Sequence, residues 1–329
     1  MDLQQKTNRM GRWVILFACM LRLAMSGIPA MLVQRLAQRS RSIIHTYVET
    51  GRNVRFSASS EEIPLFFRES PAPWMPQPEK PSFSPEDAGL VQMDYDCTYR
   101  PDLEDLLTRP LDWDLTGEEP TVLILHTHTT ESYTKDGEVY TETSAYRTLD
   151  EQYNMLCIGA RLTELLSQAG IGVIHDRNIH DHPSYNGSYV HSRQAVEEIL
   201  KQYPSIRLVL DLHRDALEKN GMQMKTVTQL EGRSCAQLML VVGTDISRQS
   251  HENWQDNLAL ALKFQVQLER LAPGIMRPVN LREQRFNQDL SPGALLIEVG
   301  TAGNTRREAL EAAKKLAEAV VCLAEGAAT

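Results

Sequence analysis

Three groups of polar residues lie at or near the ends of apolar runs in this chain, and together they supply the side chains that a hydrolytic metal site needs. The first group, HTHTTE, begins at His126 directly after the apolar run 121–125. The second is DLHRD, which contains His213. The third is Glu298, inside the otherwise apolar run 294–299. Imidazoles and a carboxylate are donors that catalytic zinc sites use, with one position left open for water.

The two histidines of the first group are spaced two residues apart, at His126 and His128. In an extended chain this spacing puts both side chains on the same side, so either or both can bind a metal. His213 follows a second apolar run, where Asp211 or Asp215 can orient its imidazole. The pattern predicts a metal site and leaves the choice between His126 and His128 open.

Glu298 is unusual because a carboxylate in an apolar strand is costly to bury without a partner or a function. One alternative is a structural ion pair with Arg282 or Arg285. The functional alternative follows from zinc, which lowers the pKa of bound water to about 7. A glutamate whose pKa is raised by apolar surroundings can take a proton from that water and pass it to a leaving amine. The chemistry expected is metal-assisted amide hydrolysis.

Apolar runs of strand length alternate with runs of helical periodicity. This order predicts an α/β fold in which a mainly parallel sheet is covered by helices. Ligands bind at the carboxyl edge of such sheets, so the three polar groups are expected to meet there. The expected strands are 121–125, 171–174, 207–212, 237–242 and 294–299, and the expected helices are 153–168, 192–202, 253–271 and 306–325.

Charge is distributed unevenly along the chain. The net charge is −9, but residues 1–55 carry nine basic side chains against Asp2 and Glu49, so the remainder is near −16. An acidic main domain excludes nucleic acid as its partner. The five cysteines form no C-x-x-C pair, which argues against a cysteine-based metal or redox site.

The first part of the chain differs from the rest. Within the basic region 1–55, the apolar segment 13–33 is predicted to be a transmembrane anchor, because about 20 apolar residues span a bilayer. An interfacial helix and a signal peptide are the alternatives for this segment. Residues 56–118 hold seven prolines between Pro64 and Pro85 and are predicted to be an extended spacer. Residues 119–329 are then the catalytic domain.

Several longer blocks in this domain resemble the stage II sporulation protein P family over roughly residues 119–325. The blocks are HTHTTESY (126–133), DEQYNMLCIG (150–159), SYNGSY (184–189), LDLHRDA (210–216), RFNQDLSPGALLIEVG (285–300) and GNT (303–305). The resemblance implies a fold like that of zinc-dependent N-acetylmuramoyl-L-alanine amidases, with helices around a sheet of six strands. It implies zinc (Zn2+) as cofactor.

The resemblance also implies an activity and a place of action. The substrate is peptidoglycan, cleaved at the amide between N-acetylmuramic acid and L-alanine, with stem-peptide cross-links as a second target. The setting is engulfment during sporulation, together with the sporulation proteins D and M. The protein is then expected to be a single-pass protein of the cell membrane, with its catalytic domain outside the cytoplasm on the mother-cell side of the sporulation septum.

Residue roles can be carried over from the amidases only in part. The first zinc ligand falls at His128, with His126 as its rival, the second histidine falls at His213 and the catalytic glutamate at Glu298. The third ligand stays open among Asp150, Glu151 and Asn154. Substrate contacts are expected from Arg214, Arg285, Asn287, Tyr185 and Asn186.

Two other functions are compatible with the same residues. One is an inactive cell-wall-binding scaffold of the engulfment machinery, although retention of His128, His213 and Glu298 argues against it. The other is a metallopeptidase that acts on protein substrates. The absence of an H-E-x-x-H motif argues against this second alternative.

Overall fold

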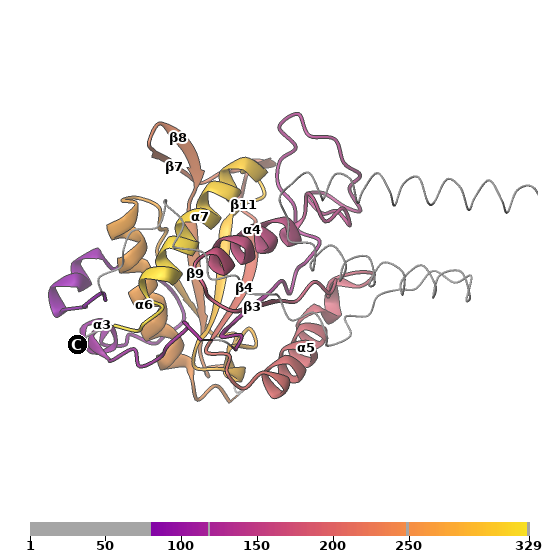
Figure 1. Cartoon of the computed structure of the whole chain (residues 1–329). Coiled ribbons are helices and arrows are strands. Elements are labelled where there is room, and N and C mark those ends of the chain that lie inside the picture. The colour runs from indigo at the N-terminus through magenta and orange to yellow at the C-terminus, as the bar shows by residue number, and fades with distance from the viewer. Residues whose placement is uncertain (1–79, 118, 248–249, 328–329) are drawn as a thin grey trace, which may run out of the picture. The chain divides into compact units, whose positions relative to one another are not determined.

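A seven-stranded sheet forms the centre of the structure, a computed structural model that describes residues 80–117, 119–247 and 250–327 (Figure 1). Neighbouring strands are parallel, except that β11 and β9 are antiparallel. The predicted α/β class is confirmed, and the sheet has one strand more than expected. Its order is β1 (Met93–Asp96), β10 (Val279–Arg282), β9 (Leu238–Gly243), β11 (Ala294–Thr301), β4 (Leu208–Asp215), β2 (Val122–Leu125) and β3 (Val173–His175).

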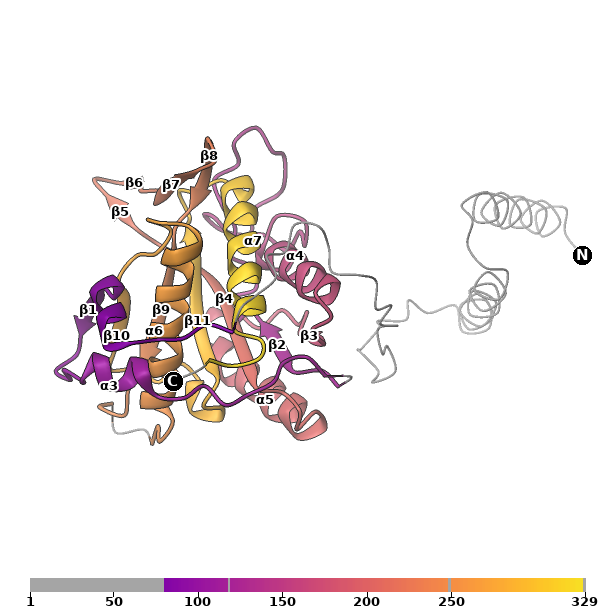
Figure 2. The same cartoon turned by 60° about the vertical axis from the view of Figure 1, so that its left-hand side comes forward.

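Helices cover the two faces of the sheet unequally, as Figure 2 shows. On one face, α4 (Met155–Gln168), α6 (Trp254–Leu271) and α7 (Arg306–Cys322) bury a large apolar core. On the other face, α5 (Ser188–Gln202) packs against a smaller cluster around β2 and β4. The side chains of β11 alternate between these two faces, and those of Leu295, Ile297 and Val299 belong to the large core. Because side chains alternate along a strand, Glu298 points to the more thinly covered face.

Residues 80–117 belong to the domain, although their proline content predicted a spacer up to residue 118. They form the helix α3 (Leu103–Thr108) and the edge strand β1, which pairs with β10. Leu106 and Leu107 are buried in the main core. The buried Lys263 of α6 donates hydrogen bonds from Nζ to the carbonyl oxygens of Leu106 and Leu107, at 3.3 and 2.6 Å. The prolines therefore do not prevent this segment from packing.

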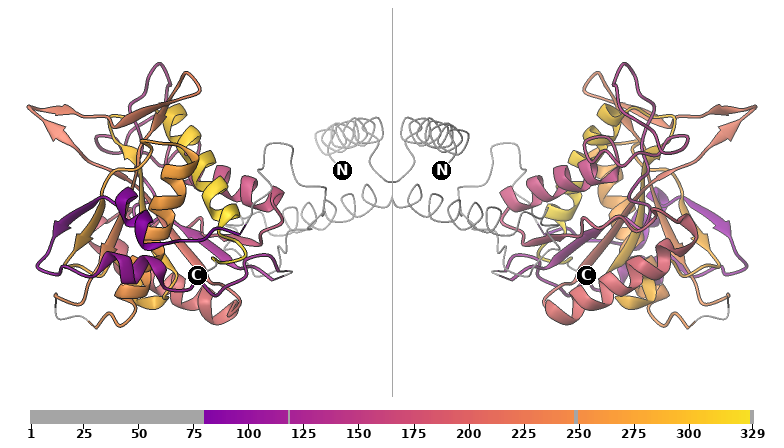
Figure 3. Two further views of the ribbon diagram at one scale, coloured as in Figure 1. Left: turned by 90° about the vertical axis from the view of Figure 1, so that its left-hand side faces the viewer. Right: turned by 90° about the vertical axis from the view of Figure 1, so that its right-hand side faces the viewer.

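Two small hairpins precede β9 and were not expected from the sequence. They extend away from the sheet in the views of Figure 3. Their turns carry Asn220-Gly221 and Glu231-Gly232 at positive φ, which suits two-residue hairpin loops. The strands are β5 (Glu218–Lys219), β6 (Met222–Gln223), β7 (Val227–Leu230) and β8 (Arg233–Ala236), and the short helical turns elsewhere are η1 (Pro85–Leu90), η2 (Tyr185–Gly187) and η3 (Gln288–Leu290).

No helix in the described part of the chain is long and apolar enough to cross a membrane. This finding contradicts the predicted single-pass localisation in the cell membrane. The segment 13–33, on which that prediction was based, lies outside the described residues, as does the rest of the basic region 1–55.

Candidate functional site

His128, His213 and Glu298 come together on the thinly covered face of the sheet. His213 of β4 and Glu298 of β11 are partners in the parallel register of these strands, so their side chains lie next to each other. His128 follows the end of β2, and its ring centroid is 5.1 Å from that of His213, with the two rings perpendicular. The structure thus brings together three residues that are far apart in sequence, as the strand-end argument predicted.

One atom of each of these three side chains is buried without a hydrogen-bond partner: Nδ1 of His128, Nε2 of His213 and Oε2 of Glu298. Unpartnered buried polar atoms are rare, and a bound ion is one explanation for them. Two imidazole nitrogens and a carboxylate match zinc in donor type. Within the residues that the structure describes, however, no three metal-binding side chains are arranged as a complete ion site.

His213 lies between two carboxylates. Its Nε2 is 3.0 Å from Oδ1 of Asp211, close but outside hydrogen-bond alignment, and its Nδ1 is 3.6 Å from Oε2 of Glu131. Burial by itself would lower the pKa of His213, but the charges of Asp211 and Glu131 raise this pKa well above its ordinary value. Asp211 is itself fixed by the backbone N–H and hydroxyl of Thr127, at 2.8 and 2.6 Å.

Glu131 is the member of this site that the sequence analysis did not single out. Burial would raise its pKa, but Arg214 and His213 hold it far below the ordinary range. Its carboxylate accepts a hydrogen bond from the backbone N–H of Arg214 at 3.1 Å. The same carboxylate lies 3.4 Å from the guanidinium group of Arg214 and 3.2 Å from that of Arg147. The only sequence signal was its place three residues after His128. Such a residue can hold His213 in a fixed orientation.

Within the described part of the chain, no arginine forms an ion pair with Glu298. Burial raises its pKa to about 8, a rise that the charges of Glu131 and Asp215 reinforce and those of His213 and Arg214 oppose. The structural alternative of an ion pair is not realised, because Arg285 pairs with Asp289 at 3.2 Å and Arg282 donates to Asn280. A carboxyl group with a pKa near neutrality is suited to taking up and releasing protons.

His126, the rival of His128, points to the opposite face of the sheet. Its Nδ1 is 3.1 Å from the carbonyl oxygen of Leu212, and its Nε2 is 2.9 Å from Nε2 of His175. Both ring nitrogens are therefore occupied, and the structure does not bring His126 to the cluster. Burial lowers the pKa of His126 to about 3 and that of His175 to about 4, which favours the neutral forms of both rings.

The three candidates for a third ligand are also placed elsewhere. Glu151 forms an exposed ion pair with Arg177. Asn154 is the N-cap of α4, where its side chain accepts the backbone N–H of Leu156 at 3.0 Å. Asp150 accepts the backbone N–H of Gln152 at 3.0 Å. Each side chain thus has a local structural task, and none is brought to His213 in this structure.

Of the predicted substrate contacts, Tyr185 lies directly at the site. Its half-exposed ring stacks on His128 with centroids 4.5 Å apart, and the Arg147 guanidinium lies 4.9 Å from the same ring. Asn186 is an exposed neighbour in η2. These residues remain candidates for contact with substrate.

The other predicted contacts already have partners within the chain. Arg214 is buried and donates to Ser132 and Tyr146 carbonyl oxygens at 3.0 and 2.9 Å, in addition to its pairing with Glu131. Arg285 pairs with Asp289 at 3.2 Å. Asn287 donates from Nδ2 to the carbonyl oxygen of Tyr189 at 2.8 Å.

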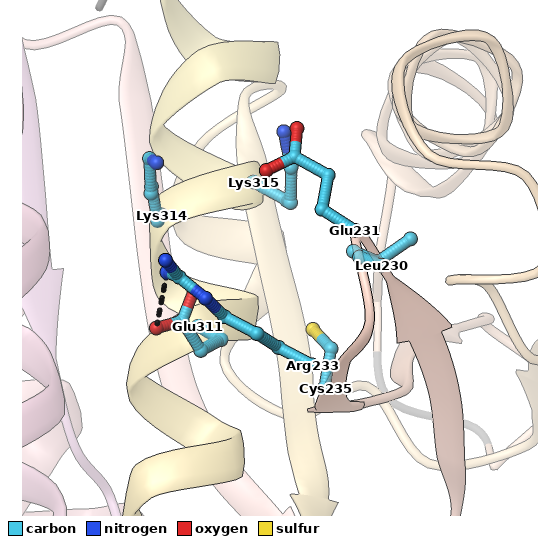
Figure 4. A pocket seen from close by; sticks show the side chains of 7 residues that line it. All are labelled: Leu230, Glu231, Arg233, Cys235, Glu311, Lys314 and Lys315. Atoms are coloured by element: carbon cyan, nitrogen blue, oxygen red, sulfur yellow. Dashed lines mark ion pairs between the residues drawn. The ribbon is translucent and has the colours of Figure 1, made fainter.

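A separate small pocket lies between the β7–β8 hairpin and α7 (Figure 4). Arg233 and Glu311 form an ion pair across it. Burial raises the pKa of the Cys235 thiol to about 12, so this thiol stays protonated. None of the cluster residues lines this pocket, whose lining is Leu230, Glu231, Arg233, Cys235, Glu311, Lys314 and Lys315.

Comparison with known proteins identifies relatives. The family model of Stage II sporulation protein P matches residues 67–321. A Stage II sporulation protein P of Bacillus subtilis (strain 168) is 28% identical over 214 residues, which are 62% of this chain and 51% of that protein. The chain therefore spans about half the length of this curated relative.

Solved structures of amidases are more distant. The CwlD amidase from Clostridioides difficile, solved with the GerS lipoprotein, is 17% identical with a TM-score of 0.38, over 61% of this chain and 94% of that chain. The amidase Ami1 from Mycobacterium smegmatis is 12% identical with a TM-score of 0.39, over 63% and 96%.

Proposed function

Because this chain belongs to the Stage II sporulation protein P family, we propose that it is a peptidoglycan hydrolase that acts during sporulation. The bond we propose is the amide between N-acetylmuramic acid and L-alanine, with stem-peptide cross-links as a second target. The observation that carries the proposal is the cluster of three unpartnered buried atoms on His128, His213 and Glu298. These are the donors and the proton carrier that amide hydrolysis needs.

The two histidines would hold zinc, which supplies a bound water of pKa about 7 and polarises a carbonyl group. Burial lowers the pKa of His128 to about 4, so its ring is neutral and able to donate a lone pair to a metal. Glu131 lies 3.6 Å from Nδ1 of His213, the ring nitrogen opposite the one left for the metal, and would set the orientation of the ring. Ligand orientation of this kind is a common task of carboxylates next to metal-binding histidines.

Glu298 would act as the general base and then as the general acid. Its raised pKa places proton uptake and release near neutral pH. In the reaction, the water oxygen forms a bond to the amide carbon while Glu298 accepts the water proton. The carbon–nitrogen bond then breaks as Glu298 gives that proton to the leaving amine. Tyr185, stacked on His128 and half exposed, is placed to contact the sugar or peptide on either side of that bond.

The proposed partners are peptidoglycan and the sporulation proteins D and M. A direct test measures metal content and the new amino-terminal L-alanine released from purified peptidoglycan, with and without a chelator. Zinc near one per chain together with chelator-sensitive L-alanine ends supports the amidase. A folded, zinc-loaded chain that binds cell wall and releases no ends supports the scaffold alternative. Digestion of casein at a rate similar to that of cell wall supports the metallopeptidase alternative.

A further inference from the structure

Tyr189 lies in the first turn of α5, against the same cluster, and has no part in the proton transfer proposed above. Its ring packs edge-on against His128, with centroids 5.6 Å apart and an angle of 86°. The ring centroid of Phe286 lies 6.0 Å from that of Tyr189, with the two rings tilted by 53°. The Tyr189 ring therefore has aromatic neighbours both in the proposed metal ligand and in the loop that precedes β11.

The hydroxyl group of Tyr189 is carried by a ring that packs against the proposed metal ligand His128. A phenol has an ordinary pKa of about 10, so this hydroxyl is a hydrogen-bond donor at neutral pH. Among the described residues, this hydroxyl makes no hydrogen bond and retains some contact with solvent. A donor without a partner in such a place is available to a substrate oxygen.

The backbone that carries Tyr189 is fixed by a strained loop. Phe286 and Asn287 are consecutive non-glycine residues at φ of 53° and 58°, in the left-handed region. Side chains other than glycine and asparagine rarely adopt this region, and such strain concentrates at functional sites. Asn287 uses this conformation to donate from Nδ2 to the Tyr189 carbonyl oxygen at 2.8 Å and to Ser192 Oγ at 3.2 Å.

The N-terminal part of α5 is also tied to the metal-binding side of the cluster. Ser192 Oγ accepts from the Thr127 hydroxyl at 2.8 Å, and that hydroxyl also contacts Asp211. Tyr189 is thus held in place from two sides before any substrate arrives. Donors fixed in advance are effective because they do not have to reorganise when charge develops in the transition state.

We propose that Tyr189 is a catalytic residue whose hydroxyl donates a hydrogen bond to the carbonyl oxygen of the scissile amide as that oxygen becomes an oxyanion. The inference rests on the proposed amide hydrolysis. It assigns a hydrogen-bond donor to the negative charge that develops on the carbonyl oxygen, which the carboxyl group of Glu298 is unsuited to stabilise. Tyr189 forms no covalent bond and keeps its proton throughout. The water proton still passes through Glu298 to the leaving amine.

The test compares the full-length wild type with Tyr189→Phe, which removes the hydroxyl and keeps the ring. Loss of one oxyanion donor lowers kcat by roughly 10²–10³-fold. We expect a loss of that size in L-alanine release, with KM, zinc content and Tm near the wild-type values. Tyr203→Phe, at the other end of α5, is the matched control and is expected to leave kcat unchanged.

Two outcomes would overturn the inference, and they differ from each other. If the wild type is active and Tyr189→Phe keeps its kcat within twofold, or loses it only together with zinc or thermal stability, the hydroxyl is not the donor and the proposed hydrolysis stands. If the zinc-loaded wild type itself releases no L-alanine ends, the proposed function fails, and the role of Tyr189 fails with it.

Discussion

Glu298 and His213 are register partners on neighbouring parallel strands, and this pairing places a carboxyl group of raised pKa next to a proposed metal ligand. The two residues have separable tasks. His213→Ala and His128→Ala are expected to lose bound zinc, because each removes an imidazole donor. Glu298→Gln is expected to keep zinc and to lose roughly 10²–10⁴-fold in kcat, the usual contribution of a general base.

Zinc content by elemental analysis and L-alanine release measure these effects. His182→Ala is the matched control, because His182 is exposed and lies outside the cluster. Full peptidoglycan cleavage by Glu298→Gln would show that the proposed proton transfer is wrong.

His126 provides a test of which histidine of HTHTTE binds the metal. A Cβ on Gly159 would lie 2.4 Å from Nε2 of His126 and 2.5 Å from Nε2 of His175, so Gly159→Ala must displace these rings. Overpacking of this kind costs about 1–3 kcal/mol. We expect Gly159→Ala to lower the free energy of unfolding while zinc content stays unchanged.

His126→Ala is likewise expected to keep its zinc. The double variant His126→Ala/Gly159→Ala should lose less stability than the two single variants lose in total, because one of the clashing rings is gone. Loss of zinc from His126→Ala would instead identify His126 as the ligand.

The pKa of Glu298 predicts how the stability of the metal-free protein depends on pH. This pKa is raised by burial from 4.5 to about 8, so between these values the unfolded chain releases a proton that the folded chain keeps. The contribution of Glu298 to the free energy of unfolding therefore falls as pH rises through this window. His213, whose pKa is raised above 6.5, adds a fall in the same direction at higher pH.

Urea unfolding in the presence of a chelator, at pH values from about 5 up to the ordinary pKa of His213, isolates the contribution of Glu298. Glu298→Gln lacks the titrating group, so its stability relative to the wild type should rise steadily across that range. A difference that stays constant with pH would mean that the carboxyl group is already ionised in the folded chain.

Glu131 should be among the most sensitive positions of the domain. Its carboxylate is buried between Arg147 and Arg214, so Glu131→Gln leaves Arg214 without its counter-charge and Arg147 with Asp181 alone. Breaking a buried ion pair from one side costs about 3–5 kcal/mol. We expect a loss of that size in chemical denaturation, together with weaker zinc binding as His213 loses one of its two flanking carboxylates.

Arg147→Gln is the comparison, because Arg147 also pairs with Asp181 at 2.6 Å and does not contact His213. Its loss should affect stability more than zinc affinity. Equal zinc affinities for wild type and Glu131→Gln would exclude Glu131 from the orientation of His213.

The domain boundary can be tested with two fragments. Residues 119–329 lack α3 and β1, so Lys263 loses both carbonyl acceptors and the edge of β10 loses its partner. Residues 80–329 keep these contacts. We expect a cooperative thermal transition from the longer fragment, measured by circular dichroism, and a lower or absent transition from the shorter one. Equal transitions would show that α3 and β1 add nothing to the domain.

The sequence was sufficient to predict the elements that have strong apolar patterns. Strands such as β2 and β11 and helices such as α4 lie within a few residues of their expected positions, because a central strand or an amphipathic helix must be apolar where it is buried. His128, His213 and Glu298 also lie together, as expected from their places at or near the ends of predicted strands. This expectation needed only the alternation of strands and helices, because that alternation predicts parallel strands whose carboxyl ends meet at one edge.

The remaining features depend on contacts that no local pattern contains. The strand β1 has an alternating burial pattern in a proline-rich neighbourhood and is recognisable only by its pairing with β10. Glu131 and Tyr189 gain their importance from His213 and His128, which are more than fifty positions away from them. The sequence could not decide between His126 and His128 as the metal ligand. The direction of the His126 side chain after β2 depends on its contacts with His175 and with the carbonyl oxygen of Leu212.

The reversal between β9 and β11 gives the molecule two chemically different ends. Strands β2, β3, β4 and β11 run toward the catalytic cluster, whereas β1, β9 and β10 run away from it. The turn after β9, which includes Asp245, therefore lies at the opposite pole. A fluorophore or an immobilising tether attached at that turn would leave the reactive end free to meet an insoluble polymer, so single molecules could be followed while they work on intact cell walls.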